Sequence, residues 1–250
     1  MLRTGKHQAW GFAVAALRRT LAVALIGCTG LASAAVVTFN NKAMDDIFGQ
    51  TSFGTFKIDI RFNEALSIVA PSLLTIDTNA EFNGGGTSLG ALVGQLQIPS
   101  DTVSMFFVDA ITFCGREDAS IVGCGNNPGA LIAVESSFAA GAKGAALMAH
   151  ELGHNLGLSH LMPSVTGNLM NSNVSGGTTL TTDQIDFFLD LSTGASRRSI
   201  LRSDANGLYI SITPIAVLAA AVPEPHIWAM LSVGLLGVAG WARRRRASAV

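Results

Sequence analysis

Residues 150–160 place three histidines at spacings that constrain the local fold more than any other feature of the chain. The stretch reads His-Glu-Leu-Gly-His-Asn-Leu-Gly-Leu-Ser-His. His150 and His154 share one face of an α-helix, because residues four apart are neighbours there. Gly157 lets the chain leave the helix sharply, since glycine readily adopts the left-handed conformation that ends helices. His160 can then return to the face that the first two histidines occupy.

These side chains form a ligand set suited to a zinc ion. Three neutral imidazoles can bind zinc and leave one coordination position for water. The sequence therefore predicts that zinc binds to His150, His154 and His160, with Asp183 left open as an alternative third ligand. Glu151 lies next to the histidine face, so it can take a proton from that water without being a ligand. Glu151 is accordingly the predicted catalytic residue.

The same stretch resembles the metzincin metallopeptidases, and its HELGHNLG core is most similar to the reprolysin/adamalysin branch. Met170 matches the family's Met-turn, a methionine beneath the zinc site, although the residue also suits an ordinary core methionine. The resemblance implies that Ala130 to Glu135 is an edge strand that pairs with an extended substrate. Two positions depart from the family pattern. Leu161 stands where an aspartate is usual, and Ser172 stands where some members have a tyrosine.

The resemblance implies an α/β fold of the α+β type. It predicts a mixed, mostly parallel twisted sheet with an active-site helix and a C-terminal helix. Hydrophobic patterning and helix caps locate these elements further. The predicted strands cover 56–62, 102–111 and 130–134, and the predicted helices cover 142–155, 183–191 and a short stretch near 64–74.

A secretory signal peptide is predicted over residues 1–34. This segment is basic, contains no acid, and ends in the small residues Ala32-Ser33-Ala34 after a short apolar stretch. Two alternatives stay open. The segment could remain as a membrane anchor, or Cys28 could be lipidated, because Leu25-Ile26-Gly27-Cys28 loosely fits a lipobox.

Cys114 and Cys124 are the two cysteines that remain after removal of the signal peptide. Disulfides form outside the cytoplasm, and an even pair in an exported chain favours one. The sequence therefore predicts a disulfide between them.

The C-terminal end carries three features in a fixed order. Pro223, Glu224 and Pro225 precede an uncharged apolar stretch over 227–242, and four arginines follow at 243–246. The stretch is predicted to be a transmembrane helix, with the arginines on the cytoplasmic side. Together these features resemble the PEP-CTERM sorting signal of Gram-negative bacteria, which implies recognition by an exosortase-type enzyme.

The predicted organisation is a signal peptide (1–34), a zinc peptidase domain (35–215), and a linker with the sorting signal (216–250). Export across the inner membrane is expected, to a periplasm-facing or cell-surface location with at least transient anchoring in the membrane. Residues 35–222 contain eight Lys and Arg against sixteen Asp and Glu, which argues against nucleic acid as a partner.

The expected function is zinc-dependent hydrolysis of peptide bonds, with a protein or peptide as substrate. Two alternatives remain at this stage. One is a non-catalytic surface or matrix protein that keeps a zinc site. The other is a metal-dependent amidase or deacylase that acts on a cell-wall or polysaccharide substrate.

Overall fold

The computed structural model describes residues 40–173, 175–220 and 231–236. The chain divides into two compact units, one spanning Ala34–Ala220 and one formed by Met1–Ser33 and Ala221–Val250. In the second unit, residues 231–236 are helical. Within the described residues, no helix has the length and apolar character needed to cross a bilayer. The predicted signal peptide, and most of the predicted membrane helix over 227–242, lie outside the described residues.

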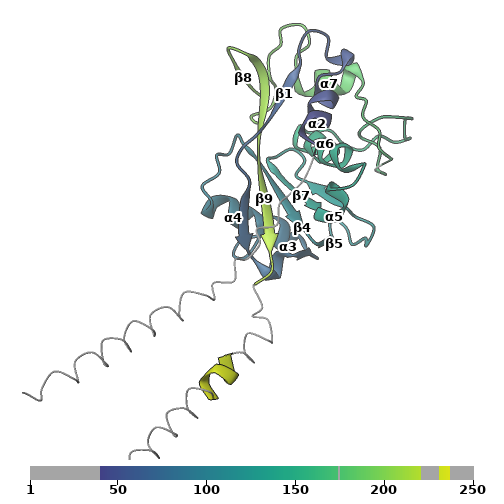
Figure 1. The fold of residues 1–250 in the computed structure, drawn as a ribbon. Helices are drawn as coiled ribbons and strands as arrows, with labels where there is room; N and C mark the ends of the chain where they lie inside the picture. Colours follow the sequence, from purple (N-terminus) through teal and green to yellow (C-terminus); the bar gives the residue numbers. More distant parts are fainter. Residues whose placement is uncertain (1–39, 174, 221–230, 237–250) are drawn as a thin grey trace, which may run out of the picture. The chain divides into compact units, whose positions relative to one another are not determined.

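The larger unit contains both helices and strands (Figure 1). The helices are α2 (Asn41–Phe48), α3 (Asn79–Asn83), α4 (Leu89–Gln95), α5 (Ser136–Ala139), α6 (Gly144–Asn155) and α7 (Thr182–Phe188), with 3₁₀ turns η1 (Thr51–Phe53) and η2 (Pro71–Leu73). The strands are β1 (Ile58–Phe62), β2 (Leu66–Val69), β3 (Thr75–Ile76), β4 (Val103–Val108), β5 (Ala110–Ile111), β6 (Gly123–Gly125), β7 (Leu131–Glu135), β8 (Arg202–Asp204) and β9 (Gly207–Leu218).

The main sheet has the order β1-β9-β4-β7-β6, and β2 and β8 also pair with β9. Strands β1, β2 and β4 run parallel to β9, and β7 runs parallel to β4. Strands β6 and β8 pair in the antiparallel direction. The prediction of a mixed, mostly parallel sheet is confirmed. Strands β3 and β5 form a separate two-stranded sheet.

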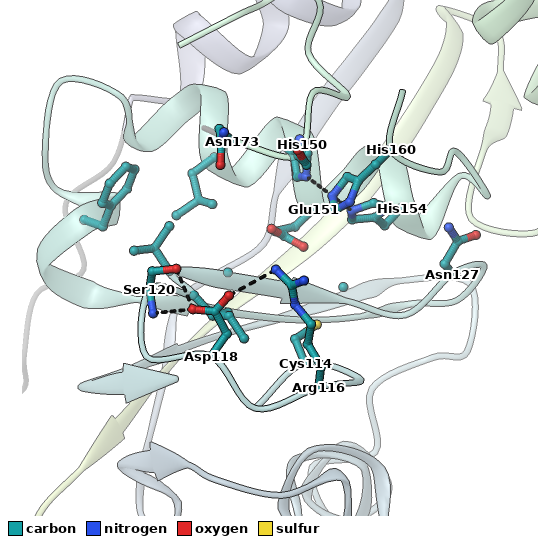
Figure 2. A pocket seen from close by; sticks show the side chains of 17 residues that line it. Cys114, Arg116, Asp118, Ser120, Asn127, His150, Glu151, His154, His160 and Asn173 are labelled. Carbon is teal, nitrogen blue, oxygen red and sulfur yellow. Dashed lines mark hydrogen bonds and ion pairs between the residues drawn. The ribbon is translucent and has the colours of Figure 1, made fainter. Parts of the chain in front are cut away.

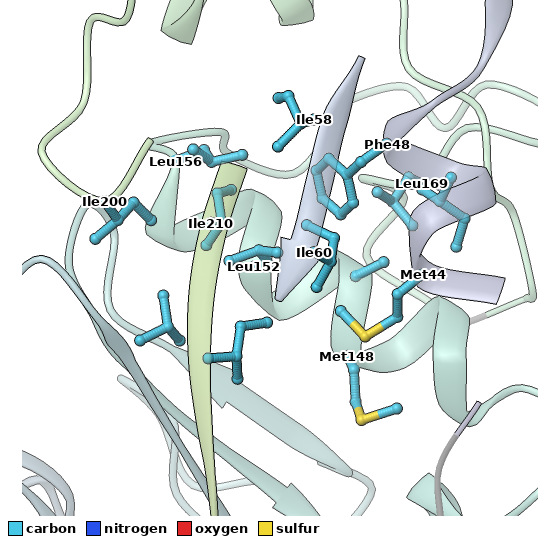
Figure 3. Packing of buried hydrophobic residues seen from close by; sticks show 14 of the residues in the cluster. Met44, Phe48, Ile58, Ile60, Met148, Leu152, Leu156, Leu169, Ile200 and Ile210 are labelled. Atoms are coloured by element: carbon cyan, nitrogen blue, oxygen red, sulfur yellow. The ribbon is translucent and has the colours of Figure 1, made fainter. Parts of the chain in front are cut away.

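Helices cover both faces of the main sheet, so its central strands are buried on both sides. Met105 and Phe107 of β4 pack into the cluster that contains α2, α6 and α7, whereas Phe106 and Val108 pack against α3 and α4. Strand side chains alternate between faces, which explains why β4 is apolar along almost its whole length. Figure 3 shows the first cluster, with Leu152 of α6 facing the strand residues.

Two sequence expectations about elements are corrected. No α-helix forms near 64–74, where a 3₁₀ turn covers Pro71–Leu73 alone. Residues 66–69 instead form β2, because the β-branched Ile68 and Val69 favour an extended strand that pairs with β9. Helix α7 is also not the last element of the unit. Strands β8 and β9 follow it, and β9 enters the middle of the sheet.

Candidate metal centre

Helix α6 carries the first two histidines and the glutamate of the motif. The helix can begin close to α5 because residue 144 is glycine; a Cβ there would collide with the backbone carbonyl of Ala139. It ends as predicted, with Gly157 at a φ of +90°, a conformation that strains other residues. Arg198 donates from Nε to the carbonyl of Leu156 at 2.7 Å, which satisfies one of the free carbonyls at the helix end.

The three predicted metal ligands come together. Nε2 of His160 lies 3.1 Å from Nε2 of His150 and 3.1 Å from Nε2 of His154. Nδ1 of His150 lies 2.6 Å from the carbonyl of Leu169, and Nδ1 of His154 lies 2.7 Å from the carbonyl of Leu158. A carbonyl can only accept, so each of these Nδ1 atoms carries the proton. The Nε2 atoms of both helical histidines therefore present lone pairs to the centre of the cluster.

This donor set fits a metal ion. One N–H on His160 could satisfy one of the two lone pairs that face it, whereas a cation attracts all three nitrogens at once. The carbonyls behind His150 and His154 fix the tautomer and the ring orientation, as is common for metal-binding histidines. The potential ligand atoms lie within 4.8 Å of one another. The His150–His154–His160 group can thus bind a metal ion, whereas Asp183, in the first turn of α7, is not part of it.

Burial keeps the three imidazoles neutral, which is the form that binds metal. It lowers the pKa of His150 and lowers the pKa of His154 to about 4. Burial also lowers the pKa of His160, and the positive charge of Arg116 adds to that effect. Each of these shifts favours the neutral imidazole that can bind a cation.

Glu151 is 4% exposed and lies beside the histidines in a narrow space between α6 and β6 (Figure 2). Burial raises the pKa of its carboxyl group to about 8. Two glycines of β6 make the space available. A Cβ on Gly123 would lie 2.5 Å from Oε1 of Glu151, and a Cβ on Gly125 would lie 2.7 Å from its backbone carbonyl.

Met170 is fully buried and packs against the motif helix from below. A Cβ on Gly153, in the middle of α6, would lie 2.5 Å from Sδ of Met170. The same short segment also supplies the Leu169 carbonyl that holds His150. Its backbone is held in turn by Asn168, whose Oδ1 accepts from the Met170 N–H at 2.8 Å. Met170 therefore lies next to the helix that carries His150 and His154, and its role as a Met-turn residue stays a prediction.

A cavity of about 470 Å³ opens over the histidines and Glu151. Gly123 and Gly125 of β6 line it, and within the described residues β6 pairs with β7 alone. The edge strand at the cavity is therefore β6 and not residues 130–135 as expected. Strand β6 pairs with β7 in the antiparallel direction, on the side of β7 away from β4. The sequence gives little indication of this strand, because two of the three residues of β6 are glycines.

The predicted disulfide is confirmed. Cys114 and Cys124 are bonded, with their Cα atoms 5.6 Å apart, and the loop that they close forms one wall of the cavity. Ser172 also lines the cavity. Tyr209, the one tyrosine in the sequence, does not line the cavity. It lies in β9, where the guanidinium of Arg61 stacks 4.0 Å from its ring centre.

Sequence reasoning missed the groups that hold the site in place. The carbonyls of Leu158 and Leu169 are backbone atoms, so residue identity gives no signal for them. Asn127 and Asn155 could have been suspected as polar residues near the motif. Asn127 donates to the Leu158 carbonyl at 2.9 Å, and the buried Asn155 donates to the carbonyl of Asn126 at 2.9 Å.

Comparison with known proteins identifies one segment of the chain. Residues 221–246 match the family model of the PEP-CTERM protein-sorting motif, which includes Pro223, Glu224 and Pro225. No curated protein matches the chain, and no solved structure does. Within the motif the structure describes residues 231–236, and the rest of the motif, including Pro223, Glu224 and Pro225, lies outside the described residues. PEP-CTERM signals mark proteins exported in Gram-negative bacteria, and the motif implies recognition of this chain by an exosortase-type sorting enzyme.

Proposed function

We propose that this protein is an exported zinc-dependent endopeptidase of the metzincin type. One observation carries the proposal: the Nε2 atoms of three histidines converge next to a buried carboxyl group, and all four residues line one open cavity. A structural zinc site usually has four protein ligands. Three histidines with a neighbouring glutamate are more typical of a catalytic site, where one position is kept for water.

The residues around the cavity have separate roles in the proposed reaction. A bound zinc ion would supply Lewis acidity, which makes water a better nucleophile and polarises the carbonyl of the scissile bond. Glu151 would accept a proton from the attacking water as its oxygen bonds to the carbonyl carbon. Glu151 would then give that proton to the leaving nitrogen as the C–N bond breaks. Its place supports this role, because Glu151 is buried and lines the same cavity as the three histidines.

Strand β6 supports an extended peptide as the substrate. In the part of the chain that the structure describes, no strand pairs with the outer edge of β6, and a peptide could continue the sheet there through backbone hydrogen bonds. Gly123 and Gly125 carry no side chains that would obstruct such a peptide. Zinc is the metal proposed because imidazole nitrogens in a three-ligand set suit it.

The test compares the full-length chain with Glu151→Gln. Each protein, loaded with zinc, is incubated with a denatured protein mixture, and new termini are read by mass spectrometry. The expected result is cleavage by the native chain and a loss of about 10²–10⁴-fold in the variant, the usual contribution of a general base. Both proteins should hold the same amount of zinc. Glu64→Gln, at an exposed position outside the cavity, is the matched control and should cleave normally.

Other outcomes would identify the alternatives. Cleavage of acylated oligosaccharides without cleavage of proteins would indicate an amidase or deacylase. Zinc binding with no hydrolysis of either substrate would indicate a non-catalytic protein that keeps a metal site. Full activity of Glu151→Gln would contradict the proposed mechanism.

A further inference from the structure

Arg116 lies on the disulfide-closed loop at the wall of the cavity that holds the histidines and Glu151. The disulfide Cys114–Cys124 fixes both ends of this loop. Figure 2 shows the guanidinium of Arg116 extending from the loop toward Glu151 and the histidines. The mechanism proposed above gives Arg116 no role, so its place in this wall calls for a separate explanation.

The guanidinium of Arg116 pairs with one carboxylate of its own loop and has further N–H donors. Its Nη2 donates to Oδ2 of Asp118 at 3.0 Å. Oδ1 of Asp118 accepts from the backbone N–H of Ser120 at 2.9 Å and from its hydroxyl at 2.6 Å. The Ser120 hydrogen bonds, together with the charge of Arg116, lower the pKa of Asp118, so the carboxylate stays charged. Among the described residues Asp118 is the acceptor found for Arg116, which leaves the other donors of its fork for a ligand.

Arg116 brings a positive charge to the wall of the cavity. Among the described residues that line the cavity, it is the one lysine or arginine. Its side chain is 79% exposed, so it is open to a ligand that enters from solvent. The surrounding sequence is strongly acidic, with sixteen acids against eight Lys and Arg over 35–222.

A carboxylate is the ligand that these features favour. The planar guanidinium can bind a carboxylate through two parallel hydrogen bonds. Such charge-assisted bonds contribute more than neutral ones. Asp118 also lines the cavity, so a second carboxylate would bind at the donors of Arg116 that Asp118 does not use.

We propose that Arg116 is a specificity-determining residue that binds a carboxylate side chain of the substrate, so that acidic peptides are preferred next to the scissile bond. This inference rests on the proposed peptidase function. It adds a substrate class to that function.

The test uses two peptides that differ only by Asp or Asn beside the bond that is cleaved. The native full-length chain, loaded with zinc, should show a kcat/KM about 10–100-fold higher for the Asp peptide, as expected for hydrogen bonds to charged groups. Arg116→Gln should bring this ratio to within about threefold of one, and Arg116→Glu should reverse it. Arg197→Gln removes an exposed arginine that pairs with Asp186 and Asp190 outside the cavity, so it should keep the native ratio.

Binding without turnover gives a second measurement. In a Glu151→Gln background, calorimetric titration should show tighter binding of the Asp peptide than of the Asn peptide, and Arg116→Gln should abolish the difference. Thermal melts of each variant would show that the fold is retained.

The outcomes separate this inference from the function that it extends. Equal kcat/KM values of the native chain for both peptides would overturn the role of Arg116 and leave the peptidase proposal intact. An equal fall in kcat on both peptides in Arg116→Gln, with the ratio preserved, would also overturn it, because that result indicates stabilisation of the reacting carbonyl. Cleavage of neither peptide, together with no cleavage of the protein mixture, would overturn both proposals.

Discussion

A Cβ on Gly123 would lie 2.5 Å from Oε1 of Glu151, so the glutamate occupies space that any other residue at position 123 would fill. Gly123→Ala should displace the carboxylate and leave the histidines in place. We expect kcat/KM to fall about 10–100-fold, because a shift of about 1 Å in a catalytic group can have that effect. Peptide cleavage and zinc content of the purified variant measure the two consequences separately.

Gly85→Ala is the matched control, since no atom lies within 4 Å of a Cβ there. It should cleave at the native rate. Native activity in Gly123→Ala would mean that the exact position of the Glu151 carboxylate does not matter for turnover.

Gly153→Ala should destabilise the protein even though the position is helical. Alanine normally favours a helix over glycine by about 1 kcal/mol. A Cβ on Gly153, however, would lie 2.5 Å from Sδ of the buried Met170, and overpacking of this kind costs about 1–3 kcal/mol. Urea denaturation should therefore show a lower free energy of unfolding than the native chain.

The same change at Gly94 supplies the comparison. Gly94 lies in α4, and no atom lies within 4 Å of a Cβ there. Gly94→Ala should raise the free energy of unfolding by about 0.4–1 kcal/mol. If both variants were stabilised equally, Met170 would not be packed against the motif helix.

The metal-free protein should lose stability between pH 4.5 and 8 because of Glu151. Burial raises the pKa of this carboxyl group from 4.5 to about 8, so over this range the folded chain keeps a proton that the unfolded chain releases. The stabilisation is complete below pH 4.5 and is lost as the pH rises to 8. Glu151→Gln removes this pH dependence. The free energy of unfolding of the variant should therefore increasingly exceed that of the native chain from pH 4.5 to pH 8.

Calorimetry in the presence of a chelator at pH 4.5, 6 and 8 measures this difference. At pH 8 the free energy of unfolding of the variant should exceed that of the native chain by more than about 1 kcal/mol. A difference of one unit between the folded-state and unfolded-state pKa corresponds to about 1.4 kcal/mol. The histidines titrate in both proteins, so their contribution cancels in the comparison. A difference that is the same at every pH would mean that the carboxylate is solvated in the folded chain.

Replacing Cys114 and Cys124 together by serine should lower the free energy of unfolding by about 2–3 kcal/mol. The disulfide closes a loop with a sequence separation of 10, and loop entropy predicts a loss of this size. Urea denaturation of the double variant gives the value. Dithiothreitol should destabilise the native chain by a similar amount and leave the variant unchanged; a response of the variant to the reductant would contradict this assignment.

The histidine site could be predicted because it depends on local geometry. His150 and His154 are one helical turn apart, and Gly157 sets the exit of the chain, so the sequence alone brings His160 close. The partners of the rings could not be predicted. The carbonyl of Leu169 reaches His150 through tertiary packing, and a backbone carbonyl is present at every residue whatever its type.

The centre of the sheet was harder to predict than the site. Strand β9 pairs with β1, β2 and β4, yet its sequence contains Pro214, which normally argues against a central strand because it lacks an N–H donor. In the structure Pro214 lies opposite Met105 of β4. Pairing between segments so far apart in the chain leaves no local pattern, whereas β4 could be recognised by its apolar run.

The position of β9 also determines when the domain can be completed. Ile58 pairs with Leu208 and Val103 pairs with Ile212, so β9 joins strands made more than one hundred residues earlier. Until β9 arrives, β1 and β4 lack the neighbour that lies between them, and the sheet remains in two parts. The sorting motif begins at residue 221, three residues after β9 ends at Leu218. In a chain that crosses the membrane unfolded, final assembly must therefore wait until translocation has almost reached the sorting motif, and the domain only then becomes able to fold.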